Sequence, residues 1–249
     1  MKSAKEYRQI GHERLAFQTG RLILVFFLIG LFLSFCNLSI NINVEDLEVI
    51  LVKLGMTNAE AIVATVTPIV LFLGAISYVT LIASLLLPGP FSLSQIVICE
   101  KAYNKETVEY KDMFSGFKDF KRVLIASILM DIYITLWSLI SFGILGIVKA
   151  YAYSMTYYIL REDSSISAND AITASKNLMM GKKMKLFVLD LSYIGWYILS
   201  SLTFGILSLW VTPRHAIAQY AFFKDVDREH YGEPTNDVVV EVKETVIDE

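Results

Sequence analysis

The stretch from Gly181 to Val226 reads GKKMKLFVLDLSYIGWYILSSLTFGILSLWVTPRHAIAQYAFFKDV. A lysine-rich entry leads into an apolar run, a Phe-Gly-Ile-Leu turn, a second apolar run and a charged exit. Each run approaches the length of about 20 residues that a helix needs to cross the hydrocarbon core of a bilayer. The stretch therefore predicts a transmembrane helical hairpin, and earlier parts of the chain repeat its pattern.

The composition of the whole chain also favours a protein that lies in a lipid bilayer. The 249 residues are 55% hydrophobic and only 19% charged, whereas average soluble domains carry about 25% charged residues. The core helices of soluble proteins seldom stay apolar on every face over windows of this length. We therefore expect an all-α, polytopic membrane helical bundle.

Six transmembrane helices are predicted, and two of the turns between them contain Phe-Gly-Ile-Leu. These turns lie at residues 142–146 and 204–208. The predicted spans are residues 22–38, 61–87, 123–141, 147–160, 186–202 and 209–223.

Shorter amphipathic segments precede or follow these spans. A polar lead-in, residues 1–18, contains Ser3 and Glu6 at the spacing of a helix-capping box. Residues 91–104 are predicted to be an interfacial continuation of the second span. Helices lying on the bilayer surface are predicted for residues 43–55, 107–120 and 165–180. In the last of these, one face holds Ala168, Ala171, Ile172, Ser175, Leu178 and Met179, after a cap formed by Ser167 and Asp170.

The charges are distributed unevenly, and their positions predict the topology. Residues 1–223 form the predicted integral membrane domain, and residues 224–249 hold nine acidic against three basic residues, which predicts a disordered tail. Lysine and arginine concentrate in the N-terminal segment, residues 101–122, residues 161–185 and the tail, and they are absent from both Phe-Gly-Ile-Leu turns. By the positive-inside rule, both termini are predicted to be cytoplasmic.

The two hairpins resemble each other. Asp131 and Trp137 precede the first Phe-Gly-Ile-Leu turn, as Asp190 and Trp196 precede the second. A duplicated hairpin explains this similarity, and chance likeness between apolar segments stays open.

Specific residues also resemble a known family. The last hairpin contains Leu191-Ser192-Tyr193-Ile194-Gly195-Trp196, and the earlier chain contains Met113-Phe114-Ser115-Gly116-Phe117-Lys118 and Lys149-Ala150-Tyr151-Ala152-Tyr153-Ser154-Met155. With these motifs the chain resembles the bacterial multipass membrane family DUF975, over most of its length. The resemblance implies a helical membrane protein and supplies no activity and no catalytic residues. It also implies a distant similarity to the non-catalytic membrane domain of some glycerophosphodiester phosphodiesterases.

The chain departs from the family pattern at two positions. Phe142 stands where the family usually has proline, and Arg214 stands where it usually has tyrosine. The first departure implies a looser turn, and the second places a charge inside a predicted span.

Charged residues at membrane depth are the main candidates for function, because they are costly to bury there. They are Asp131, Asp190 and Arg214. We expect Arg214 to pair with Asp131 or with Asp190, because a pair lets both groups stay charged. Such a pair locks two hairpins together, which we favour, or lines a path for a solute or a proton. Arg214 reaching toward a lipid headgroup is a further interpretation.

Two more polar residues belong to this candidate set. His215 is the only histidine inside a predicted span, and Lys149 precedes Tyr151 and Tyr153. Lys149 faces a lipid headgroup in one interpretation and anchors a helix near the interface in the other.

No stretch of the sequence carries an enzyme motif, such as a metalloprotease, serine hydrolase or phosphate-loop pattern. Cys36 and Cys99 stand apart in apolar surroundings and are interpreted as small buried hydrophobic residues. We therefore expect no catalytic residue, no metal and no cofactor. The expected function is a non-enzymatic membrane component whose partners are the lipid bilayer, anionic lipid headgroups or another membrane protein, and not nucleic acid. The alternative is a small transporter or transport accessory that uses Asp131, Asp190 and Arg214, and an intramembrane enzyme has little support.

Overall fold

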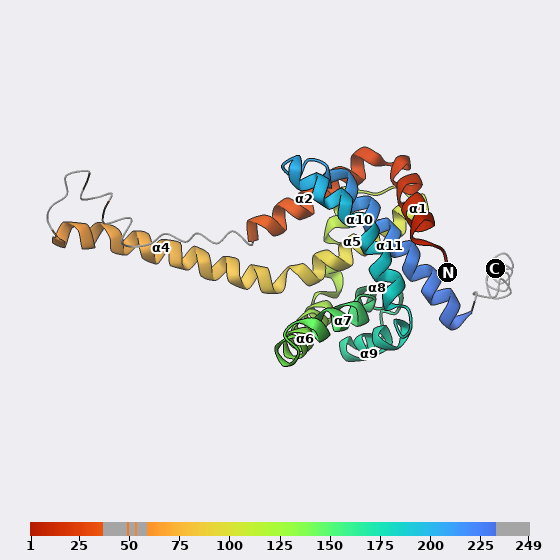
Figure 1. Cartoon of the computed structure of the whole chain (residues 1–249). Helices are drawn as coiled ribbons and strands as arrows, with labels where there is room; N and C mark the ends of the chain where they lie inside the picture. The colour runs from red at the N-terminus through yellow and green to blue at the C-terminus, as the bar shows by residue number, and fades with distance from the viewer. Residues whose placement is uncertain (37–48, 50–52, 54–58, 233–249) are drawn as a thin grey trace, which may run out of the picture. The chain divides into compact units, whose positions relative to one another are not determined.

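The computed structural model describes residues 1–36, 49, 53 and 59–232. This part of the chain is helical and contains no β-strand, so the predicted all-α class is confirmed. The predicted surface helix 43–55 lies almost wholly outside the described residues, as does the tail from residue 233. The helices (Figure 1) are α1 Ala4–Phe17, α2 Thr19–Cys36, α4 Ala59–Leu86, α5 Pro88–Tyr103, the 3-10 helix η1 Tyr110–Asp119, α6 Phe120–Ile140, α7 Ile144–Tyr153, α8 Thr156–Glu162, α9 Ala168–Leu178, α10 Lys183–Leu202 and α11 Ser208–Tyr231.

The chain divides into two compact units, residues 1–27 together with 89–249, and residues 28–88. The second unit contains α4, which begins and ends close to the predicted span at residues 61–87. No part of the apolar window of α4 is buried inside the protein. An apolar helix without a protein covering agrees with a membrane span.

Two helical stretches in the described residues are long and apolar enough to cross a membrane, Ala64–Leu86 and Tyr110–Ile140. A third candidate is α1 taken together with the first part of α2, although a bend of 102° separates them. The structure thus supports two or three membrane spans. The six-span count stays a prediction, because α7 and α8 are short and α10 and α11 carry more polar residues.

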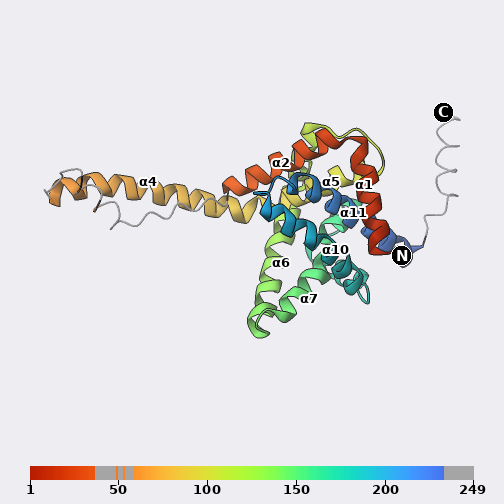
Figure 2. The ribbon, with the colours of Figure 1, turned by 45° about the horizontal axis from the view of Figure 1, so that its top comes forward.

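The N-terminal helix packs against the last hairpin. Its start has the predicted capping box, since the Glu6 N–H donates to Ser3 Oγ and the Ser3 N–H donates to the Glu6 carboxylate. Tyr7, Gly11 and Leu15 form its buried face, which meets α11 and α10 (Figure 2). Gly11 is required there, because a Cβ at this position would overlap the Arg214 carbonyl oxygen.

Gln18 holds the bend between α1 and α2. Its side-chain amide donates to the Glu106 carbonyl at 2.5 Å and accepts from the Val108 N–H at 2.9 Å. The lead-in is therefore a packed helix that turns sharply before the first predicted span.

α5 covers the predicted interfacial segment, residues 91–104. Nearly all faces of this helix are buried in protein, including Phe91, Ser94, Ile98 and Cys99. η1 covers it closely, with Gly116 so near the Pro90 carbonyl that a Cβ would overlap it. The interfacial position stays a prediction, whereas the prediction that Cys99 is buried is confirmed.

The two Phe-Gly-Ile-Leu turns have the same backbone at the Phe-Gly pair, after which α7 begins at Ile144 and α11 only at Ser208. Phe142 and Phe204 take positive φ angles of 51° and 50°, and the following glycines continue with positive φ. In each turn the glycine N–H donates to the carbonyl five residues earlier, Gly143 to Ser138 and Gly205 to Ser200, both at 2.8 Å. This is the Schellman pattern that ends helices. Proline at residue 142 could not adopt this φ, since its ring fixes φ near −65°.

The predicted fourth span, residues 147–160, is not one continuous helix. It breaks between α7 and α8, and Ser175 of α9 occupies the break. The Ser175 hydroxyl accepts from the Met155 N–H at 3.1 Å and donates to the Ala152 carbonyl at 2.9 Å. A side chain distant in sequence thus replaces helical hydrogen bonds at this point.

α9 begins at the predicted cap, because the Asp170 N–H donates to Ser167 Oγ at 3.2 Å. Every residue of its predicted apolar face is buried. That face contacts α6 and α8 through neighbours such as Ala126 and Leu160, so it packs on protein and not on a bilayer surface.

The predicted boundary at residue 223 lies inside α11, which runs to Tyr231. Lys2 Nζ contacts the Asp225 carboxylate at 2.8 Å, and Lys224 pairs with Glu162. The first part of the predicted tail is therefore a packed helix, because these ion pairs and the buried Val226 hold it against the rest of its unit.

Candidate functional site

A polar network links α7, α10 and α11 around Asp190. Its carboxylate accepts from Tyr151 Oη at 2.9 Å and from Gln219 Nε2 at 3.0 Å, and it lies 2.8 Å from His215 Nε2. On the other side of the imidazole, Nδ1 lies 2.9 Å from Tyr197 Oη. Each of these groups is partly or largely withdrawn from solvent, so the network satisfies polar groups that would be costly to bury alone.

The hydrogen bonds fix the role of one nitrogen of His215. An ionised carboxylate can only accept, so His215 Nε2 donates to such a carboxylate at Asp190. In a neutral imidazole Nδ1 then accepts from the Tyr197 hydroxyl, and in a protonated imidazole it donates to that oxygen. The three groups form a continuous chain along which a proton can move.

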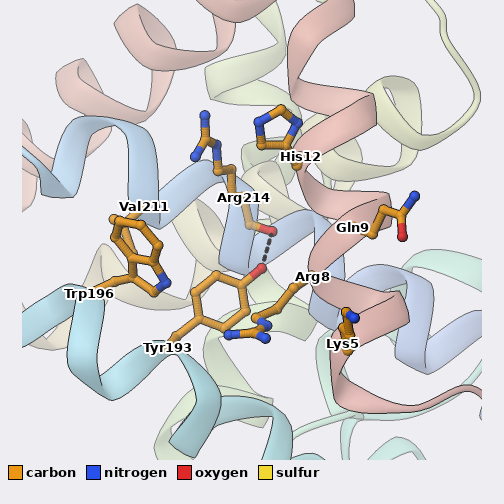
Figure 3. Close-up of a pocket in the computed structure, with 8 residues that line it drawn as sticks. All are labelled: Lys5, Arg8, Gln9, His12, Tyr193, Trp196, Val211 and Arg214. Carbon is orange, nitrogen blue, oxygen red and sulfur yellow. Dashed lines mark hydrogen bonds between the residues drawn. The ribbon is translucent and has the colours of Figure 1, made fainter.

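A cationic pocket lies beside this network, between α1, α10 and α11, with a volume of about 350 Å³. Figure 3 shows Tyr193 and Trp196 of α10 on one side of it and α1 on the other, with Arg8 extending toward Tyr193. Its lining residues are Lys5, Arg8, Gln9, His12, Tyr193, Trp196, Val211 and Arg214. No acidic residue lines it.

Tyr193 connects the pocket with the network. Its ring stacks on the His215 ring at a centroid distance of 4.4 Å, and its hydroxyl donates to the Arg214 carbonyl at 3.4 Å, as drawn in Figure 3. Tyr193 is therefore the side chain that both contacts His215 and lines the pocket.

The predicted pairing of Arg214 with Asp131 or Asp190 is wrong. Within the described residues Arg214 makes no ion pair, and its Nε atom is buried without a hydrogen-bond partner. His215 takes the place beside Asp190 that was predicted for Arg214. Consecutive residues of a helix point in directions about 100° apart, so His215 and Arg214 face different surroundings.

The other predicted candidates, Asp131 and Lys149, belong neither to the network around Asp190 nor to the cationic pocket. Asp131 is exposed on α6, and no hydrogen bond or ion pair of its carboxylate occurs within the described part of the chain. Lys149 lies over the Trp137 ring at 4.3 Å from the ring centroid. This contact joins α6 with α7 and favours the anchoring interpretation of Lys149.

Sequence reasoning missed several members of these groups. Tyr151, Tyr197 and Gln219 were not singled out for hydrogen bonding, although Gln219 lies one helical turn after His215 on the same face. The cations of α1 were assigned to topology alone. Their spacing carried a further signal, because Lys5, Arg8 and His12 lie on one face of a helix, next to the buried face of Tyr7, Gly11 and Leu15.

An ion pair and a buried phenol hold α1 near the pocket. Burial alone would raise the pKa of Asp225, but hydrogen bonds from Lys2 and Tyr7 and the charge of Lys2 lower it below its usual value. Burial, followed by the hydrogen bond to Asp225, raises the pKa of Tyr7 above its usual value. The carboxylate therefore stays charged and the phenol stays protonated at neutral pH.

In residues 1–36 and 59–232 the structure holds no group of three or more histidine, cysteine, aspartate or glutamate side chains that could bind a metal ion. The arrangement offers two kinds of chemistry, a hydrogen-bonded chain for protons and a cationic pocket for anions.

A family model described as "Protein of unknown function (DUF975)" matches residues 1–148 and 139–230. No curated protein and no solved structure matches the chain. The distant similarity to the membrane domain of glycerophosphodiester phosphodiesterases is not shown by these comparisons. Since the matched segments extend over nearly the whole sequence, the chain belongs to the DUF975 family.

Proposed function

We propose that this DUF975 protein is a multi-pass protein of the bacterial inner membrane, with six crossings and both termini in the cytoplasm. Its role in this proposal is non-enzymatic binding of membrane lipid. Two or three helices of the structure could span a membrane. The segment α7–α8 and the two helices of the hairpin α10–α11 provide the remaining three crossings.

The observation that carries this proposal is the exposure of large apolar side chains on both hairpins. Phe142 and Phe204 at the two turns are 100% and 98% exposed. Leu139 and Leu202, which precede the turns, are 74% and 73% exposed. Contiguous exposed apolar surface is unstable in water and is typical of surfaces that meet lipid or a partner.

The distribution of charge supports the proposed orientation. Both turns lack lysine and arginine, while the opposite ends of the hairpin helices carry Lys121, Arg122, Lys182 and Lys183. The positive-inside rule then places the turns in the periplasm and the lysine-rich ends in the cytoplasm.

Cysteine labelling tests this topology. In a variant with Cys36 and Cys99 replaced by alanine, single cysteines are placed at Phe142 and Phe204, with Lys118 and Lys176 as cytoplasmic controls. In intact cells lacking an outer-membrane barrier, an impermeant maleimide is expected to label the two turns and to label the controls only after permeabilisation. Labelling of all four sites from the same side would contradict the six-crossing proposal.

Proton-coupled transport is a second candidate function, and the chain of Tyr197, His215 and Asp190 favours it. A carboxylate and an imidazole in hydrogen-bond contact inside a predicted span are typical of proton relays. The transporter prediction used three charged residues, Asp131, Asp190 and Arg214. Of these, only Asp190 belongs to the hydrogen-bonded chain with His215 and Tyr197.

Purified protein in liposomes containing a pH-sensitive dye tests this candidate. An imposed membrane potential is expected to drive proton entry through the wild type and not through Asp190→Asn or His215→Gln variants of equal thermal stability. Asp131→Asn is the matched control, which should conduct as the wild type does. Proton entry no faster than in protein-free liposomes would exclude this function.

A further inference from the structure

Among residues 1–36 and 59–232, the cationic pocket between α1, α10 and α11 is lined by basic side chains and by no acidic ones. Lys5, Arg8, His12 and Arg214 reach it from two different helices, and no carboxylate lines it. Like charges held close together repel one another, so such a cluster is costly unless an anion is present. An anion bound in the pocket would therefore lower the repulsion between these side chains.

Other cationic side chains of the same unit differ from those of the pocket, because they are paired with carboxylates. Lys2, Lys101 and Lys224 each lie within ion-pair distance of a carboxylate. Within the described part of the chain, Arg8 donates to the Ser192 carbonyl at 3.3 Å and forms no ion pair, and Arg214 has a buried Nε without a hydrogen-bond partner. Guanidinium groups are the side chains best suited to bind phosphate, because their donors form paired hydrogen bonds.

The walls of the pocket select among anions. Tyr193, Trp196 and Val211 present mainly apolar surface beside the cations. Tyrosine and tryptophan combine an apolar body with a polar edge, and they favour the headgroup level of a bilayer. A volume of about 350 Å³ is at the small end of ligand pockets, which suits a phosphate with a short polar substituent.

We propose that this pocket binds a phosphate-bearing anion, namely the headgroup of an anionic phospholipid or free phosphate. The phosphate oxygens contact the guanidinium group of Arg8 or that of Arg214, which lie on opposite sides of Tyr193 in Figure 3, and the remaining cations supply positive charge around it. Trp196 and Val211 contact the apolar part of the molecule. The lipid source rests on the proposed membrane function, whereas binding of phosphate as such does not.

Native mass spectrometry of the full chain in detergent tests this proposal, with phosphatidylglycerol, phosphatidylcholine and inorganic phosphate as the added ligands. Phosphatidylglycerol is expected to bind at least about tenfold more tightly than phosphatidylcholine, because the cationic side chains of the pocket repel the choline ammonium group, which phosphatidylglycerol lacks. Stronger binding of inorganic phosphate than of phosphatidylglycerol would identify the free anion as the source.

The variant Arg8→Gln/Arg214→Gln is expected to weaken binding of the preferred anion by about tenfold or more. The control Lys118→Gln/Lys176→Gln removes the same charge from exposed positions outside the pocket and is expected to bind as the wild type does. If the arginine variant unfolds, Lys5→Gln/His12→Gln replaces it, because both side chains are exposed, and a loss of binding is again expected.

Equal anion binding by pocket and control variants would overturn the proposal, as would the absence of any preference for anions. Neither outcome alters the maleimide labelling pattern, so a failure of the pocket proposal is distinguishable from a failure of the proposed topology.

Discussion

In the hairpin α6–α7 the carboxylate of Asp131 is exposed, whereas in the hairpin α10–α11 the carboxylate of Asp190 lies at the centre of a hydrogen-bonded network. The tryptophans at matching positions differ in the same way, since Trp137 lies under Lys149 and Trp196 lines the cationic pocket. Yet the turns of the two hairpins have the same backbone at the Phe-Gly pair. Similar sequence thus gave similar local structure, and different neighbours gave the equivalent residues different roles.

The largest difference between the hairpins is expected from removal of their carboxylates. Asp190→Ala leaves Tyr151, Gln219 and His215 without their shared partner and should destabilise the protein by about 3 kcal/mol, at about 1 kcal/mol for each hydrogen bond. Asp131→Ala breaks no contact in the described structure and should change stability by less than about 0.5 kcal/mol. Chemical denaturation in detergent measures both, and equal effects would show that the two carboxylates are equivalent.

Glycine substitution tests the packing within each hairpin. A Cβ at Gly146 would lie 3.0 Å from the Ser138 Cβ and overlap its hydroxyl, so Gly146→Ala should separate α6 from α7 and cost about 2 kcal/mol. Gly195 of α10 has no atom from outside its own helix within 4 Å of such a Cβ. Gly195→Ala should therefore stabilise α10 by up to about 1 kcal/mol. The same assay reports both, and a stabilising Gly146→Ala would refute the close approach.

The shared turn predicts equal effects where the hairpins are alike. Phe142 and Phe204 have positive φ and fully exposed rings. Glycine at either position relieves a backbone strain of about 1 kcal/mol without loss of a protein contact. Phe142→Gly and Phe204→Gly should therefore raise the thermal midpoint in detergent by similar amounts. A gain at only one turn would show that the two backbones differ.

The smallest expected effect is a pH dependence confined to the second hairpin. The pKa of Asp225 is lowered in the folded protein, so its bond to Lys2 stabilises the α1–α11 contact above the usual aspartate pKa of about 4. This contribution disappears as the pH falls through the lowered pKa. Between pH 6 and pH 3 the wild type should lose more hydrogen-exchange protection in α1 and α11 than Asp225→Asn does. An equal loss in both proteins would assign the acid sensitivity to other groups.

Much of the fold was predictable because it depends on local interactions. The caps at Ser3 and Ser167, the buried face of α9 and the positions of the two Phe-Gly-Ile-Leu turns follow from spacing along a single helix or turn. The break between α7 and α8 was not predictable in this way. It depends on Ser175, which approaches from another helix.

The candidate site was predictable only in its residue types. A charge inside a predicted span drew attention to Asp190, Arg214 and His215, and all three belong to the network or the pocket. Their partners were predicted wrongly. A helical pattern gives the direction of a side chain around its own axis, and it does not give the helix that lies opposite.

The sequence by itself determined that this protein is helical, rich in apolar segments and a member of the DUF975 family, because composition, periodicity and motifs are properties of a single chain. Only the tertiary structure decided that Asp190 binds His215, that Arg214 forms no ion pair with any residue that the structure describes, and that α1 completes a cationic pocket. The physical reason is that these contacts join helices distant in sequence, and their geometry is set by the packing of whole helix faces.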